Sequence, residues 1–97
     1  MIHLQIIGKD GVHIQPLVRA AIQKGRIKAF KTVQVKGGVK IQHTKYLGSI
    51  RFAQKRNILF ATLKCHNKAK EWQLLESFIG RLTYHFKESM SAINIQF

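Results

Sequence analysis

The sequence predicts an α+β domain spanning residues 1–97, a two-layer sandwich in which a mainly antiparallel sheet of about four to six strands carries two helices on one face. Several short segments alternate apolar and polar residues, as half-buried strands do, and two segments repeat apolar residues at helical spacing. A chain of 97 residues with 45% hydrophobic content forms one compact domain. Two helices can cover only one face of such a sheet, so we expect the other face to be open.

A strand and then a helix begin the sequence. Residues 2–7, IHLQII, alternate apolar and polar side chains with the period of a half-buried strand. Pro16 suits the first turn of a helix, and Gly25 suits the left-handed residue that follows a helix. The apolar stripe of this predicted helix is Leu17, Val18, Ala21 and Ile22.

Residues 30–36 and 39–44 predict a hairpin around a Gly-Gly turn. A two-residue turn at these glycines would set the polar face of one strand against the apolar face of the other. A three-residue or bulged turn pairs Val33 with Ile41 instead. It also pairs Val35 with Val39, so the apolar side chains share one face and we predict the bulged turn.

Residues 49–54 and 58–65 predict a second hairpin. Its buried side should hold Ile50, Phe52, Leu59, Ala61, Leu63 and Cys65. Its other side should hold Arg51, Phe60, Thr62 and Lys64. Between the two helices we therefore expect three or four strands, with a break near Tyr46 and Leu47.

Residues 67–90 have the strongest helical pattern in the sequence. Asn67 is available as the N-cap, whose side chain accepts a hydrogen bond from the first turn. The predicted core-facing stripe is Trp72, Leu74, Leu75, Phe78, Ile79, Leu82 and Phe86. Residues 92–97, AINIQF, alternate again and predict a last strand that joins the sheet.

Positive charge is the most informative property of the sequence. There are 17 Lys and Arg against 4 Asp and Glu, for a formal net charge of +13. Thirteen of the basic residues lie in residues 1–67, where Asp10 is the only acid, and ten lie from Lys24 to Arg56 with no acid among them. Such a segment repels itself unless an anion binds, so the sequence predicts a polyanionic partner.

Basic and amide side chains gather on the expected open face of the sheet. That face should hold His3, Gln5, Gln34, Lys36, Lys40, Gln42, Arg51, Phe60, Thr62, Lys64, Asn94 and Gln96. Basic side chains neutralise phosphates, amides reach base edges and an exposed phenylalanine stacks on an unpaired base, so this is the chemistry of a nucleic-acid-binding surface. The candidate binding residues, the first four of them placed in the loop after the first helix, are Lys24, Arg26, Lys28, Lys31, Lys36, Lys40, Arg51, Lys55, Arg56, Phe60 and Lys64.

The favoured function is non-enzymatic binding of nucleic acid. RNA is favoured over DNA because neither predicted helix presents a recognition surface for a major groove. A small metal-independent ribonuclease or toxin is an alternative, in which histidine would act with lysine or arginine. The five histidines show no spacing that joins them, and we place His43 at the boundary of the core beside Ile41. We therefore assign no catalytic residue and expect no cofactor.

The sequence gives little indication of a disulfide, a metal site or a membrane-spanning segment. Cys65 is the single cysteine, which excludes an internal disulfide and favours a reducing cytoplasmic location. The adjacent Cys65 and His66 point to opposite faces of a strand and cannot share an ion, so we expect no metal site. No apolar run approaches the roughly 20 residues that span a bilayer, and the long amphipathic helix lacks a basic polar face, so we expect no membrane partner.

A homo-oligomeric interaction module is the other alternative. An open sheet face, or the edge strand at residues 93–97, could pair with a second copy and cover Ile7, Ile58 and Phe60. A homodimer would also join two basic surfaces into a larger one, so self-assembly and nucleic-acid binding are compatible.

Overall fold

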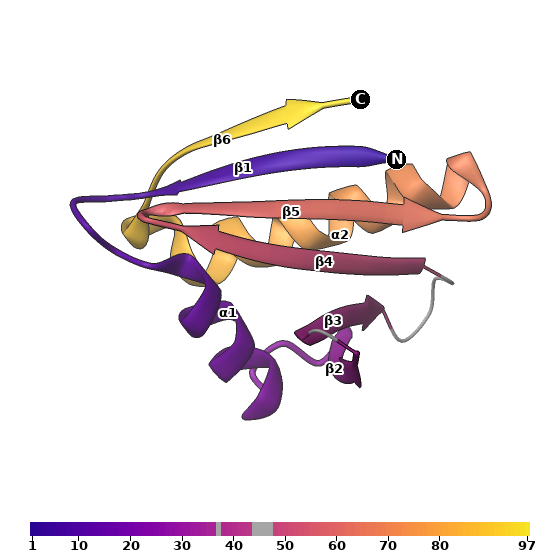
Figure 1. Ribbon diagram of the computed structural model, residues 1–97, viewed down its shortest axis with the longest axis horizontal. Coiled ribbons are helices and arrows are strands. Elements are labelled where there is room, and N and C mark those ends of the chain that lie inside the picture. The colour runs from indigo at the N-terminus through magenta and orange to yellow at the C-terminus, as the bar shows by residue number, and fades with distance from the viewer. Residues whose placement is uncertain (37, 44–47) are drawn as a thin grey trace.

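The computed structural model describes residues 1–36, 38–43 and 48–97. The elements are β1 (Ile2–Gly8), α1 (Ile14–Gln23), β2 (Phe30–Val35), β3 (Gly38–His43), β4 (Gly48–Lys55), β5 (Ile58–Cys65), α2 (Lys68–Phe86), a short 3-10 turn (Lys87–Ser89) and β6 (Met90–Gln96) (Figure 1). The strands form one six-stranded antiparallel sheet in the order β2-β3-β4-β5-β1-β6. The predicted α+β sandwich is confirmed.

One hydrophobic core lies between the sheet and the two helices. In Figure 1 the view is onto the sheet, with α2 behind β4 and β5. Alternate side chains of the central strands are buried because they point toward the helices. The strand residues of the core are Ile2, Leu4, Ile6, Ile41, Ile50, Leu59, Ala61 and Leu63. The helix residues of the core are Ile14, Val18, Ala21, Ile22, Leu74, Leu75, Phe78 and Leu82. Neither α1 nor α2, the two α-helices of the described residues, covers the opposite face of the sheet, as predicted.

The first helix starts earlier than its proline indicates. Ile14 belongs to α1 and is fully buried, whereas Leu17, predicted to lie in the stripe, is 38% exposed. The capping of the helix also differs from the usual pattern, since His13 makes no side-chain cap. Instead the Gln54 side-chain oxygen accepts a hydrogen bond from the Gln15 backbone N–H at 3.1 Å. This contact from β4 satisfies one of the free amides of the first turn.

The second helix, α2, is capped as predicted, but the face that it turns toward the core differs from the prediction. The Asn67 side chain accepts a hydrogen bond from the Ala69 backbone N–H at 2.8 Å, which confirms the N-cap. Trp72 is 52% exposed, so its predicted place in the core is wrong. Glu71 is buried there instead, on the same face as Leu74 and Phe78. A charged residue occupies the stripe because it has an ionic partner, described below.

The register of the β2–β3 hairpin differs from the prediction. Thr32 lies opposite Ile41 and Val33 opposite Lys40, so the predicted valine pairings are wrong. The predicted bulged turn contains Gly37, which lies outside the described residues. The cause is Phe30, which is 4% exposed and packs edge-on against Phe78 with ring centroids 5.9 Å apart. Burying this aromatic ring stabilises the fold by more than burying a valine, because more apolar area leaves water.

This shift exchanges the two faces of β2. Val33 and Val35 lie on the open face, half-buried, while Gln34 alternates with them and does not join the open face as predicted. The predicted break near Tyr46 and Leu47 lies outside the described residues. The β4–β5 hairpin has the predicted faces, with Ile50 opposite Leu63 on the core side and Arg51 opposite Thr62 on the open side.

Candidate nucleic-acid interface

The open face of the sheet is organised in rows that cross the strands. Residues directly opposite each other in antiparallel strands share a face, with Cβ atoms about 4.5–5.5 Å apart. The pairings that link β3, β4, β5, β1 and β6 define one row, which we call the central row: Lys40, Arg51, Thr62, His3 and Gln96. A neighbouring row holds Ala53, Phe60, Gln5 and Asn94. Lys31, opposite Gln42, and Lys64, opposite Ser49, lie beyond the central row.

Positive charge on this face has no acidic neighbour among the described residues. Lys40 lies directly opposite Arg51, a like-charge pair that destabilises a sheet by about 0.2–1 kcal/mol. Within residues 1–36, 38–43 and 48–97, the ion pair formed is between the Met1 amine and Glu71, away from this face. The described lysines and arginines of the open face therefore form no ion pair with a carboxylate, and a bound anion would relieve the repulsion.

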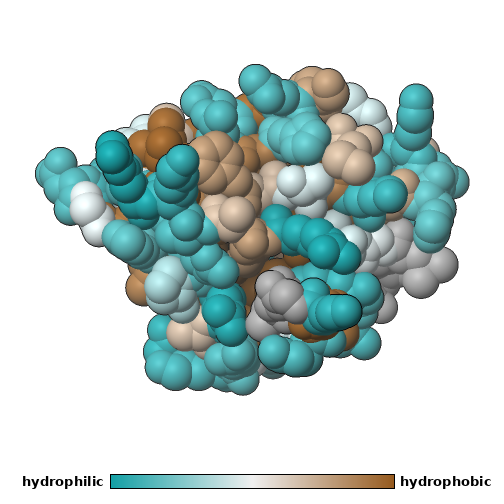
Figure 2. Space-filling view, viewed as in Figure 1, coloured by the Kyte–Doolittle hydropathy of each residue, from teal (hydrophilic) through white to brown (hydrophobic). Residues whose placement is uncertain are grey.

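A hollow of about 310 Å³ lies at the end of the β4–β5 hairpin. Its lining consists of Lys55, Arg56, Ile58 and Phe60. Figure 2, in the view of Figure 1, shows an apolar area over β4, β5 and β1 with hydrophilic side chains around it. Phe60 and Ile58 are half-buried there, so each keeps part of its surface exposed to solvent. The hollow thus places an aromatic ring next to two cations.

Arg56 adopts a backbone conformation that glycine prefers. Its φ is 55°, in the left-handed region that costs an ordinary residue about 1–2 kcal/mol. Hydrogen bonds hold the turn in place: the Gln54 side chain donates to the Arg56 carbonyl at 2.7 Å, and the Asn57 side chain donates to the Gly8 carbonyl at 2.9 Å.

Replacing Arg56 with glycine should raise the free energy of unfolding by about 1 kcal/mol, because glycine relieves the left-handed strain. Urea denaturation followed by circular dichroism measures this change. Arg56→Ala is the matched control, since it removes the same charged side chain and keeps the strain. Equal stabilisation by alanine and glycine would show that charge repulsion, and not backbone strain, is the cost at this turn.

A second hollow, of about 330 Å³, lies at the other end of β4. It is lined by Lys40, Gln42, Gly48, Ser49 and His66. Ser49 and Lys55, at opposite ends of the strand, are about 20 Å apart at the usual rise per residue. The central row crosses β4 between the two hollows, at Arg51. The basic face therefore extends along the length of β4, from one hollow to the other.

The structure divides the candidate residues into two groups. Those on the open face or on its hairpin turns are Lys31, Lys36, Lys40, Arg51, Lys55, Arg56, Phe60 and Lys64. Lys24 ends α1, and Arg26 and Lys28 are exposed in the following loop. Lys31 does not belong to that loop as predicted, because it lies in β2. Ser49, which was not among the predicted residues, also lies on the open face, opposite Lys64. The alternation that places Arg51 on that face predicts this position too.

The histidines occupy different surroundings. His43 Nε2 lies 3.1 Å from Ser77 Oγ, and its ring meets Phe30 edge-on at 4.9 Å. This confirms its place beside the core. His3 lies on the open face, with Nδ1 3.4 Å from Thr62 Oγ1. No group of His, Cys, Asp and Glu in the described part of the chain could hold a metal ion.

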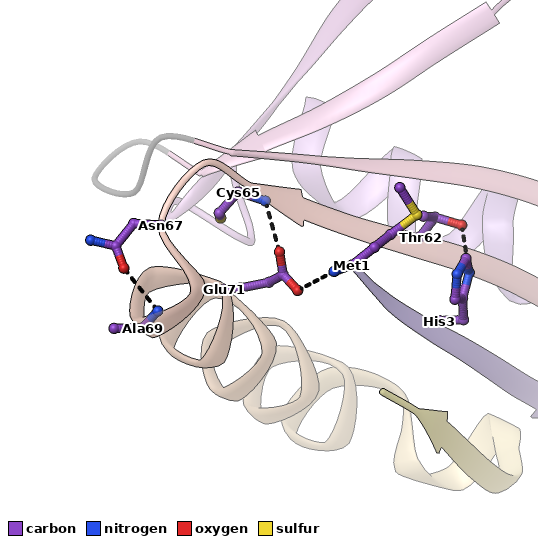
Figure 3. A network of polar contacts seen from close by, with 7 residues as sticks. All are labelled: Met1, His3, Thr62, Cys65, Asn67, Ala69 and Glu71. Atoms are coloured by element: carbon purple, nitrogen blue, oxygen red, sulfur yellow. Dashed lines mark hydrogen bonds and ion pairs between the residues drawn. The ribbon is translucent and has the colours of Figure 1, made fainter.

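Glu71 joins the amino terminus to the end of β5. Its carboxylate lies 2.7 Å from the Met1 amine and accepts a hydrogen bond from the Cys65 backbone N–H at 3.1 Å (Figure 3). Burial alone would raise the pKa of Glu71, but the hydrogen bonds from Met1 and Cys65 and the positive charges of Met1 and Lys68 outweigh it and hold the pKa below its usual range. Glu71 is therefore ionised at neutral pH.

Cys65 is not prepared for thiolate chemistry. Burial raises the pKa of its thiol, and the negative charge of Glu71 raises it further, against a smaller opposing effect of the amino terminus. A thiol with a raised pKa is mostly protonated at neutral pH and is a poor nucleophile. Its side chain is half-buried and packs against the core. This environment agrees with the predicted structural role.

Comparison with known proteins does not extend these findings. No protein-family model, curated protein sequence or solved structure matches this chain. Fold and surface together define a small α+β protein with one face covered by helices and one basic open face. In the part of the chain that the structure describes, no helix combines the length and apolar character needed to cross a membrane.

Proposed function

We propose that this protein binds nucleic acid, with RNA favoured over DNA, through the open face of its sheet. The observation that carries the proposal is the like-charge pair of Lys40 and Arg51, directly opposite each other in the central row without an acidic neighbour among the described residues. Such a pair is costly in the free protein and favourable beside phosphates. The proposed role is binding without catalysis.

The arrangement supports a division of roles among the side chains. Lys40, Arg51 and Lys64 would contact phosphates and position the chain. Phe60 would stack on an unpaired base, because its ring lies on the open face beside two cations. Gln5 and Asn94 lie in the same row as Phe60, where their amides could bind base edges.

Single-stranded RNA suits this face better than duplex DNA. Neither helix presents a strongly basic recognition face for a major groove, because α1 is only 10 residues long and α2 carries Glu71 and Glu76 among its basic side chains. An open sheet with a partly exposed aromatic ring is instead a platform on which unstacked bases can lie. Base stacking on an aromatic side chain contributes about 1–3 kcal/mol per base.

Fluorescence-anisotropy titration with single-stranded RNA, duplex RNA and duplex DNA of equal length, over a range of salt concentrations, tests the proposal. We expect the tightest binding to single-stranded RNA, and Phe60→Ala should weaken it by about tenfold, the equivalent of about 1.4 kcal/mol. Duplex binding should change much less, because paired bases are not available for stacking.

The control variant is Tyr84→Ala, since Tyr84 is an 81% exposed aromatic residue on α2. Its replacement should leave RNA affinity unchanged. Weak binding that is equal for the three ligands and disappears with modest salt would reject a specific site. Each RNA is also run on a gel after titration, because cleavage would replace the binding proposal with the ribonuclease alternative.

A further inference from the structure

Strand β6 is a free edge of the sheet. It pairs with β1 on one side only, since the strand order ends with β6. Six of its seven residues are exposed or half-exposed, from Ser91 to Gln96. A strand at an edge presents unpaired backbone N–H and C=O groups, which another strand can pair with.

Beyond the register shift at its start, opposite Ile7 and Gly8, this edge lacks the usual protection against pairing. Residues 89–97, SMSAINIQF, contain no charged side chain, no proline and no glycine, in a chain with a net charge of +13. The opposite edge strand, β2, carries Lys31 as its second residue and follows the basic loop that contains Arg26 and Lys28. Lysine on an edge strand prevents sheet extension, so β2 is protected and β6 is not.

Apolar side chains gather on the helix side of the β6 edge. Ile95 is 39% exposed, Phe97 is 72% exposed, and the exposed Trp72 of α2 stacks on Phe97 with ring centroids 4.8 Å apart. A hollow of about 180 Å³ beside this pair is lined by Met1, Ile2, Lys68, Glu71, Trp72 and Phe97. Exposed aromatic residues next to a free strand edge are typical of an interaction surface.

We propose that β6 pairs with β6 of a second copy of this chain about a two-fold axis, which makes one continuous antiparallel sheet across a homodimer. A second copy is the occupant that the charge distribution favours. The side chains of β6 carry no charge in a strongly basic molecule, so two copies that meet at this edge keep their basic strands far apart. A polyanion would be attracted to the opposite end.

Two-fold pairing would also give hydrogen-bond partners to the backbone N–H and C=O groups that β6 leaves unpaired. Antiparallel pairing of one strand with its own copy is self-complementary: the residue on the axis lies opposite its own copy, and each other residue of the edge makes reciprocal contacts with a different residue of the partner. Ile95, Phe97 and Trp72 of both copies would then lie on the helix side of the joined sheet. On the open face, Asn94 and Gln96 from both copies would meet at the axis. The pairing is inferred from the edge itself and does not depend on the proposed function.

Light scattering after size-exclusion chromatography, at several protein concentrations in moderate salt, measures the expected dimer. Ile95→Lys should raise the dimer dissociation constant at least about tenfold, because it places a lysine of each copy in the paired edge. Leu17→Lys is the matched control: Leu17 is 38% exposed and Ile95 39%, and both variants add one positive charge. A monomeric wild-type protein, or a dimer that Ile95→Lys and Leu17→Lys affect equally, would overturn the proposal.

Disulfide cross-linking gives an independent test that does not require a destabilising change. In a Cys65→Ala background, Asn94→Cys and Gln96→Cys place thiols on β6, and paired antiparallel strands bring Cα atoms within disulfide range. We expect an oxidised dimer from at least one of these variants. Lys31→Cys, on the opposite edge strand, is the control. Cross-linking at Lys31→Cys alone, or at none of the three positions, would contradict pairing through β6.

Discussion

Replacing Lys40 and Arg51 together with alanine should weaken the binding of single-stranded RNA roughly 30-fold. Both side chains lie in the central row, and each would lose a contact to a phosphate. A contact of this kind contributes about 1 kcal/mol, so two lost contacts amount to about 2 kcal/mol, or roughly 30-fold in affinity. The slope of log affinity against log salt should fall by about 1.4 as two phosphates cease to be neutralised.

The matched control removes the same amount of charge elsewhere. Lys9 and Lys87 are both exposed and lie outside the central row, so Lys9→Ala with Lys87→Ala lowers the net charge by the same two units. Anisotropy titrations of the two double variants at one salt concentration compare the effects directly. If both lose affinity equally, the positive charge acts as a diffuse attraction and the site assignment is wrong.

The same double replacement should leave the fold intact and slightly stabilise it. Lys40 and Arg51 repel each other across two neighbouring strands, and removing this repulsion returns up to about 1 kcal/mol. Weaker RNA binding from a more stable protein would therefore separate function from folding. Lower stability would instead indicate that the stems of these side chains pack against the sheet.

Much of the fold and of the candidate site follows from local alternation. The β4–β5 hairpin buries Ile50 and Leu63 on one side, so Arg51 and Phe60 must lie on the other, and the sequence pattern predicts both results. The open face itself follows from having two helices for one sheet. Where a strand has one apolar side, the burial of that side determines the orientation of every residue in it.

The errors arise where contacts between distant segments outweigh the local pattern. Val33 and Val35 suggest one face of β2, but Phe30 packs on Phe78 of α2 and reverses it. Trp72 completes an apolar stripe, but Glu71 takes the buried position because its partner is the amine of Met1. Both partners are far away in the sequence. Periodicity within a segment carries no information about them.

Glu71→Gln should lower the free energy of unfolding at neutral pH by about 1.5–3 kcal/mol, the usual worth of a hydrogen bond to a charged group. Glu71 is 7% exposed and bonds both the Met1 amine and the Cys65 backbone N–H. The amide can replace one of these contacts and cannot neutralise the ammonium group. Urea denaturation followed by circular dichroism measures the loss, and Glu76→Gln, an exposed change on the same helix, should have little effect.

The pH dependence of this loss identifies its cause. The pKa of Glu71 in the folded protein is below its usual value, so the ionised carboxylate stabilises the fold at pH values above the unfolded pKa. That contribution is lost as the pH falls from the unfolded pKa through the lower folded pKa. The difference between wild type and Glu71→Gln should therefore be full at neutral pH and shrink on acidification below about pH 4.5. A difference that stays constant with pH would assign the effect to packing of the side chain instead of its charge.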